Sequence, residues 1–327
     1  MSRMARSRRR NLGKALAVAV AAGAAGALAL RAGQKRWATD DDPCGPEGLQ
    51  LPDGTARTVT TDDGAKLEVL VAGPPDGPTV VLPHCWGGTR ALWGAVARRL
   101  VQTRHQVVLY DQRGHGTSSM GLSPSTTDRL GDDLRAVLEA VDVRDAVLAG
   151  HSMGGMTVQA LAVNHPDVID ARVRALVLVA TSAHALPRPL AAALADRALG
   201  DRMLSPWAKN AVGLAFTRGA VGRKVYRPHV EATRDAFFGT SGKVRSGFLV
   251  AISNMDYRKG LASITVPTTV LVGTRDGLTP PRMARVLAEG IPKAELIVLP
   301  DAGHMLPLEE PEAVTAAIVA HTDDRRP

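Results

Sequence analysis

The sequence predicts an α/β protein in which a mostly parallel sheet is covered by helices on both faces. Short apolar runs alternate with helical patterns over more than 100 residues, which is typical of this class. The apolar content of 45% allows a large core, and the aromatic content of 3% means that Val, Leu and Ala must fill it. A length of 327 residues fits one such domain with an inserted subdomain.

The folded body is expected to begin near Arg57 with a hairpin whose turn is Asp62-Asp63-Gly64. The flanking strands are predicted at residues 57–61 and 66–72, further strands at 79–83, 107–110, 146–149 and 175–180, and helices at 92–100, 130–141 and 153–164. Open sheets of this kind bind ligands beyond the carboxyl ends of their strands, so the functional residues should follow those ends.

The alternation stops near His184, and residues 185–259 contain helical segments without a convincing core strand. Ser205-Pro206 is a good helix start. We expect a helical lid here, inserted into a core formed by residues 57–184 and 260–322. In the second part of the core, strands are predicted at 268–273 and 295–299, and helices at 281–289 and 311–321.

The lid segment carries 13 Lys or Arg against 5 Asp or Glu. Two interpretations stay open for this excess: a solvated outer face, or attraction to an anionic lipid or an acidic substrate. For the whole chain, the net charge of +8 comes from the amino-terminal leader, since residues 1–36 hold nine basic and no acidic residues. The remainder has 31 basic against 32 acidic residues, and no basic stripe with interleaved aromatics indicates a nucleic-acid partner.

The leader combines a basic block with the uncharged run Ala15 to Leu30, which predicts a signal peptide or a short membrane anchor. A helix over this run would span roughly 24 Å, slightly less than a bilayer core of about 30 Å. Residues 9–14 resemble a twin-arginine export signal. More positive charge precedes the run than follows it, which places the body outside the cytoplasm. An uncleaved anchor, a cleaved signal and a disordered cytosolic tail remain as alternatives, and residues 37–56 are predicted as a linker.

The segment Gly150-His151-Ser152-Met153-Gly154 joins a predicted strand to a predicted helix and has the Gly-x-Ser-x-Gly pattern of a nucleophile elbow. Gly150 and Gly154 lack a Cβ, which lets strand and helix approach closely. Such a turn exposes the serine hydroxyl and directs helix N–H groups towards a developing negative charge. The alternative is an ordinary glycine-rich turn.

A nucleophilic serine needs a base, and the base needs a group that orients it. Asp276 and His304 each follow a late strand end, and the order Ser152, Asp276, His304 is the one expected for such sheets. Asp276 could instead form a turn with Gly277, and His304 could be a surface histidine. Asp301 is the competing acid. His151 is interpreted as a packing or pocket-rim residue.

Together with Tyr110-Asp111-Gln112-Arg113-Gly114-His115-Gly116-Thr117-Ser118, these motifs resemble the α/β-hydrolase fold family over residues 57–322. The resemblance implies an eight-stranded, mostly parallel sheet with a helical lid. It also implies an oxyanion hole formed by the backbone N–H groups of Trp86 and Met153. The leader followed by this domain is similar to actinobacterial hydrolases with an Ala-rich amino-terminal segment.

One position departs from the family, which usually has His-Gly where this chain has His84-Cys85. The Cβ of Cys85 could alter the local backbone, although Gly87 and Gly88 could compensate. Cys85 as a nucleophile is a remote alternative to a small core or pocket-lining residue. Cys44 and Cys85 are the only cysteines, and neither a metal site nor a disulfide framework is expected from them.

The expected function is a serine hydrolase that cleaves a carboxylic ester without cofactor or metal. A serine nucleophile argues against the epoxide hydrolase and dehalogenase relatives, which use aspartate. Two alternatives stay open: a cofactor-free perhydrolase or haloperoxidase-like enzyme with the same triad, and a non-catalytic ligand-binding protein. The expected partner is a small ester, with lipid-like esters as one option if residues 15–30 associate with a membrane.

Overall fold

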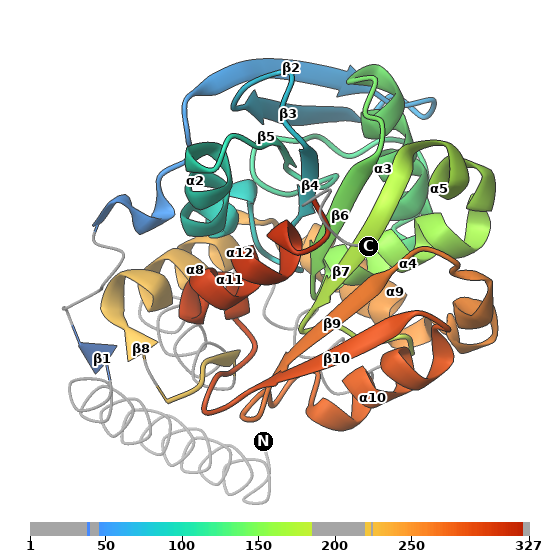
Figure 1. The fold of residues 1–327 in the computed structure, drawn as a ribbon. Helices are drawn as coiled ribbons and strands as arrows, with labels where there is room; N and C mark the ends of the chain where they lie inside the picture. The colour runs from blue at the N-terminus through green and yellow to red at the C-terminus, as the bar shows by residue number, and fades with distance from the viewer. Residues whose placement is uncertain (1–37, 40–45, 185–219, 224, 323–327) are drawn as a thin grey trace, which may run out of the picture.

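The computed structural model describes residues 38–39, 46–184, 220–223 and 225–322, and its centre is one eight-stranded sheet (Figure 1). The strand order is β10-β9-β7-β6-β4-β5-β3-β2, and every neighbouring pair is parallel except β2–β3 and β3–β5. The strands are β2 (Gly54–Thr60), β3 (Lys66–Ala72), β4 (Thr79–Pro83), β5 (Gln106–Tyr110), β6 (Ala146–His151), β7 (Val173–Val179), β9 (Thr268–Gly273) and β10 (Ala294–Leu299). The predicted fold class is confirmed.

The central strands are buried on both faces, which explains their nearly continuous apolar sequences. Successive side chains still alternate between two core layers. Val81 of β4 belongs to one layer, whereas Val80 and Leu82 belong to the other. A sheet with two apolar faces is stable only when helices cover both, and the helices divide accordingly.

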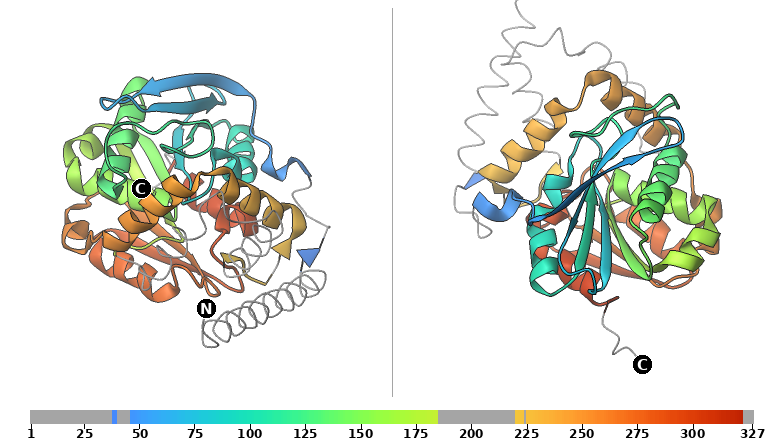
Figure 2. Two further views of the ribbon diagram at one scale, coloured as in Figure 1. Left: turned by 180° about the vertical axis from the view of Figure 1, so that it is seen from behind. Right: turned by 90° about the horizontal axis from the view of Figure 1, so that it is seen from above.

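One face packs against α2 (Gly94–Gln102) and α12 (Pro311–Val319), and the other against α3 (Thr127–Ala140), α4 (Met153–Asn164), α5 (Pro166–Arg172) and α10 (Pro281–Gly290) (Figure 2). Helix α5 is absent from the sequence prediction. It has seven residues and begins with proline at its first position, so it is too short to show a helical period.

Two helices form a separate layer across one edge of the sheet: α8 (Arg227–Gly239) and α9 (Gly242–Asn254) (Figure 2). Arg245 holds their connection together. Its guanidinium donates to the Phe237 carbonyl at 2.9 Å and to that of Thr240, and lies 4.8 Å from the Phe237 ring centre. These helices lie in the predicted lid segment, whereas the predicted start at Ser205-Pro206 lies outside the described residues.

The remaining elements are short. They are β1 (Ala38–Thr39), which pairs in parallel with β8 (Val225–Tyr226), the 3₁₀ helices η1 (Pro46–Leu49), η2 (Arg90–Trp93) and η3 (Arg258–Ser263), and α11 (Leu306–Glu309). Strand β2 begins inside the predicted linker 37–56, because Gly54 pairs with Ala72.

Within the described part of the chain, none of the helices combines the length and the apolarity that crossing a bilayer requires. The segment 15–30 lies outside that part, as does Cys44, so the signal or anchor stays a prediction.

Candidate active site

Ser152 stands between β6 and α4 with φ 54° and ψ −114°, a conformation that side chains rarely adopt. Its N–H donates to the Val179 carbonyl at 2.9 Å. A Cβ on Gly150 would lie 2.4 Å from the Gly154 carbonyl oxygen, and a Cβ on Gly154 would lie 2.1 Å from that of Pro83. Both positions therefore require glycine, and the close packing around them holds Ser152 in its strained turn.

Asp276 and His304 lie in the loops after β9 and β10, whose final residues, Gly273 and Leu299, pair with each other. His304 Nδ1 lies 2.9 Å from Asp276 Oδ2, and both side chains are buried. Because a carboxylate only accepts hydrogen bonds, Nδ1 carries the proton and Nε2 is free to accept one.

Two backbone N–H groups, from Leu278 and Thr279, donate to Asp276 Oδ1, each at 2.8 Å. The Thr279 hydroxyl donates to Oδ2 at 2.7 Å. Burial raises the pKa of Asp276, but the charge of His304 and the hydrogen bonds from His304 and Thr279 outweigh burial and lower it to about 2. Asp276 is therefore an ionised, fixed partner of the imidazole at neutral pH.

Asp301, the competing acid of the sequence analysis, points elsewhere. Its carboxylate accepts from Arg275 Nε at 2.9 Å and lies 3.9 Å from Arg223, at the exposed surface. Its φ of 59° places it in a tight turn, so its role is to shape the loop that carries His304.

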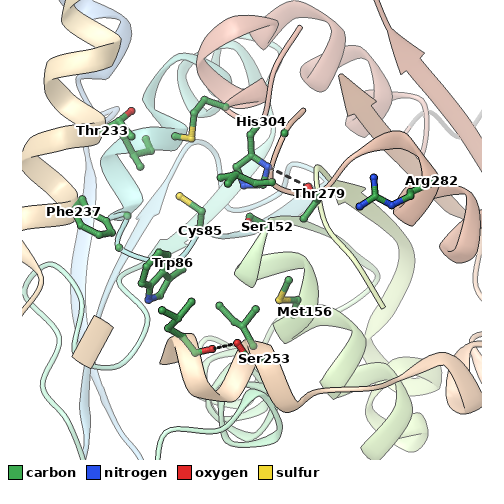
Figure 3. A pocket seen from close by; sticks show the side chains of 18 residues that line it. Cys85, Trp86, Ser152, Met156, Thr233, Phe237, Ser253, Thr279, Arg282 and His304 are labelled. Atoms are coloured by element: carbon green, nitrogen blue, oxygen red, sulfur yellow. Dashed lines mark hydrogen bonds between the residues drawn. The ribbon is translucent and has the colours of Figure 1, made fainter. Parts of the chain in front are cut away.

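Ser152 and His304 both line a cavity of about 610 Å³ beneath α8 and α9 (Figure 3). Between these two described side chains there is no hydrogen bond from the serine hydroxyl to the imidazole. Ligand-free catalytic pairs often stand apart in this way and close on substrate. The structure thus brings all three predicted residues to one sheet edge, with the Asp276–His304 pair already formed.

A second set of contacts fixes the His304 loop from behind. The N–H groups of His304 and Met305 both donate to the Ala220 carbonyl, at 2.7 and 3.2 Å. Glu309 accepts from three backbone N–H groups, those of Gly222, Gly303 and Met305, at 2.7 to 2.9 Å. Burial raises the pKa of Glu309 in spite of these bonds.

Two backbone segments, around Gly222 and around Gly303, pass very close to each other at the same place. A Cβ on Gly303 would lie 2.3 Å from the Gly222 nitrogen, and a Cβ on Gly222 would lie 2.3 Å from the Asp301 carbonyl oxygen. Only glycines allow this approach. The segment that leads into the α8–α9 layer is therefore joined directly to the loop of His304.

The loop after β4 carries Trp86 and is held by two histidines. His84 Nδ1 donates to the Cys85 carbonyl at 2.8 Å, and His115 Nε2 accepts from the Gly87 N–H at 3.1 Å. Burial lowers the pKa of His84, and burial, with repulsion between the two rings when both are protonated, lowers the pKa of His115 to about 3, so both rings are neutral at pH 7. Gly87 has φ +66°, so the glycine is needed there.

Cys85 does not distort this loop, because Gly87 rather than Cys85 takes the positive φ. Among the described residues the buried Cys85 thiol has no disulfide partner, and burial raises its pKa to about 12. A thiol that stays protonated at neutral pH is a poor nucleophile. Cys85 is instead a small residue in the cavity wall.

Met153, the other predicted oxyanion donor, is the first residue of α4 and is buried. The closeness of Gly154 to the Pro83 carbonyl shows that the start of α4 packs against the chain that enters the Trp86 loop. The N–H groups of a first helical turn have no partner within the helix and suit a developing anion.

His151, the neighbour of Ser152, is buried and does not line the cavity. Its Nε2 donates to the His304 carbonyl at 2.8 Å, and burial, together with the charge of His304, lowers its pKa to about 3. The packing interpretation of His151 agrees with this position.

The rest of the cavity wall is mostly apolar, with Met156, Phe237, Leu249 and Ile252 among its residues. In the described part of the chain, no group of three or more His, Cys, Asp or Glu side chains is arranged to hold a metal ion.

Three site residues escaped the sequence analysis. Thr279 binds the Asp276 carboxylate, Glu309 ties the His304 loop, and His115 holds the Trp86 loop. His115 stood inside a quoted motif, but no local pattern gave its contact. Thr279 and Glu309 carry no motif, because their partners come together only in the folded chain.

The chain resembles several known proteins in sequence and in structure. The family model described as the alpha/beta hydrolase fold matches residues 78–311. The chain is 29% identical over 265 residues to 3-oxoadipate enol-lactonase 2 of Acinetobacter baylyi, covering 80% of this chain and 95% of that protein. It is 28% identical over 271 residues to the bifunctional esterase/perhydrolase DCH of Acinetobacter calcoaceticus, covering 80% and 98%. A solved hydrolase from Pseudomonas aeruginosa PA01 is 30% identical, with a TM-score of 0.70 over 82% of this chain and 98% of that one.

Proposed function

The chain belongs to the α/β-hydrolase fold family, and we propose that it is a serine hydrolase that cleaves a carboxylic ester through an acyl-enzyme. The observation that carries this proposal is the buried Asp276–His304 pair, whose imidazole lines the same cavity as the strained Ser152. Relatives named as a lactonase and an esterase support ester chemistry, since a lactone is a cyclic ester.

In this mechanism His304 Nε2 accepts the Ser152 proton as the hydroxyl oxygen attacks the ester carbonyl. Asp276 keeps the proton of the imidazole on Nδ1 and stabilises the imidazolium that forms. The protonated His304 then donates to the leaving alcohol. Water, activated by the same imidazole, attacks the acyl-enzyme and releases the acid.

The carbonyl oxygen becomes negative in both tetrahedral intermediates. The N–H groups of Trp86 and Met153 are the proposed donors to it, supported by the packing of the Trp86 loop beside the start of α4. Loss of one such donor typically costs about 2.7–4 kcal/mol of transition-state stabilisation.

The test is Ser152→Ala, assayed by fluorophosphonate labelling and by p-nitrophenyl acetate turnover. Wild-type protein should label and turn over, and the variant should do neither. Labelling that persists in the variant would overturn the assignment of the nucleophile. Tight binding of an ester by wild-type protein without turnover would favour a non-catalytic binding protein.

A second candidate, perhydrolysis, is favoured by the relative named as a bifunctional esterase/perhydrolase. There, hydrogen peroxide replaces water as the acceptor of the acyl group and gives a peracid. Addition of peroxide to a turnover mixture separates the two: peracid formation supports perhydrolysis, and unchanged release of the carboxylic acid alone supports plain hydrolysis.

A further inference from the structure

One charged side chain stands out in the wall of the cavity. Arg282 is the only Lys, Arg, Asp or Glu among the described residues that line it. The close-up shows its guanidinium directed towards Thr279, on the side of the cavity that holds Ser152 and His304 (Figure 3).

Arg282 forms no ion pair with any residue that the structure describes, although most arginines of the folded body have one. It occupies the second position of α10, and the first turn of this helix contains no acidic residue. A cation is disfavoured at this end of a helix, where the macrodipole is positive. Arg282 is exposed at the rim of the cavity, so no described protein side chain neutralises its charge and a ligand can reach it.

A ligand that carries a carboxylate would supply a counter-ion for Arg282. A guanidinium presents paired N–H donors that match the two oxygens of a carboxylate. Because Arg282 is exposed, water screens part of this attraction, and one such pair gives a modest preference.

We propose that the substrate is an ester or lactone that carries a carboxylate away from its scissile carbonyl, and that Arg282 binds this carboxylate. The inference rests on the proposed function. The apolar wall contacts the hydrocarbon between the two polar ends, and Arg282 and Ser152 fix those ends. Arg282 is thus a specificity-determining residue that takes no part in the bond-breaking steps.

The test compares two p-nitrophenyl esters of adipic acid, one with its second carboxyl free and one with that carboxyl methylated. The two differ in charge and hardly in shape. Wild-type kcat/KM should favour the free acid by about two- to five-fold, the range expected for a carboxylate paired with an exposed arginine. In Arg282→Met this preference should vanish, because the KM for the anion rises more than the KM for the methylated ester.

Arg285→Met is the matched control. Arg285 lies one turn further along α10, is exposed and does not line the cavity, so this variant removes the same charge from the same helix. It should keep the wild-type preference for the free acid. Equal turnover of both esters by wild-type protein, or a preference that survives Arg282→Met, would overturn the inference while the hydrolase assignment stands.

Binding of adipate, measured by calorimetry, separates this inference from the proposed function. If no ester is turned over and no fluorophosphonate label forms, the hydrolase assignment fails. Adipate binding by wild-type and Arg285→Met protein, but not by Arg282→Met, would then still support the carboxylate site. Wild-type protein that binds no adipate would refute it.

Discussion

Replacing Asp276 with asparagine tests the proton positions on which the proposed mechanism depends. Oδ1 of Asp276 accepts from two backbone N–H groups, so the amide oxygen of asparagine must occupy that site. The amide NH₂ then takes the place of Oδ2 and faces His304 Nδ1. Because an NH₂ only donates, Nδ1 must lose its proton and Nε2 must carry one. An imidazole in this tautomer cannot accept the proton of Ser152.

The size of the effect has two parts. The first is electrostatic: Asp276, whose pKa is lowered to about 2, is ionised at neutral pH and stabilises the imidazolium that forms, whereas a neutral asparagine does not. The tautomer reversal adds to this. Together we expect kcat to fall by about 10⁴-fold, as in serine hydrolases whose triad acid becomes an amide.

The assay is p-nitrophenyl acetate hydrolysis, with thermal unfolding to show that the variant folds. Asp301→Asn is the control: it removes an acid from the same loop as His304, but one that pairs with exposed Arg275. That variant should keep kcat within about two-fold, since exposed ion pairs contribute only about 0–1 kcal/mol. An Asp276→Asn enzyme within ten-fold of wild type, or a larger loss in Asp301→Asn, would refute the assigned acid.

The pH dependence of Asp276 follows from the same pKa. A carboxylate whose pKa is lower in the folded state stabilises the fold above its unfolded value of 3.8, and this contribution is lost as the pH falls through about 2. Asp276 should therefore contribute no titration to the rate profile above about pH 4.

Two further predictions concern the packing around the site. In a Cys44→Ser background, native Cys85 should resist iodoacetamide at pH 9 and react rapidly in urea, because burial raises its pKa to about 12 and only the thiolate reacts; mass spectrometry reads the modification, and rapid native alkylation would contradict the burial. Gly154→Ala should lower the free energy of unfolding by about 1–3 kcal/mol in a denaturant titration, because its Cβ would lie 2.1 Å from the Pro83 carbonyl oxygen. Gly239→Ala, where nothing lies within 4 Å of the added Cβ, is the matched control and should not destabilise, so equal losses in both variants would count against the steric explanation.

Ser152, Asp276 and His304 could be predicted because each follows a strand end and their order along the chain is characteristic. The sequence identifies the acid of the triad less clearly, since Asp276 and Asp301 both lie at a turn. The three-dimensional difference is the direction of the carboxylate: Asp276 faces the imidazole, whereas Asp301 faces Arg275.

Contacts made across the fold explain what the sequence left out. Glu309 is the last residue of the short helix α11, and its Oε2 accepts from the N–H groups of Gly222 and Gly303, which lie in two separate loops. The sequence predicts only that Arg282 lies in a helix, because its place in the cavity wall depends on where α8 and α9 lie. Strand β2 starts earlier than predicted for the same reason, since pairing with β3 decides its length.

The close approach of Gly222 and Gly303 has a consequence for engineering. Exchange of the α8–α9 layer with that of a relative is an obvious route to new substrates. Here the graft boundary cannot fall freely after β7, because the Ala220 carbonyl accepts from the His304 N–H and the Gly222 N–H donates to the Glu309 carboxylate. A chimera should keep these residues together with Gly303 and Glu309, all from the same parent protein. In a chimera whose boundary separates them, the His304 imidazole would shift along with the transplanted helices.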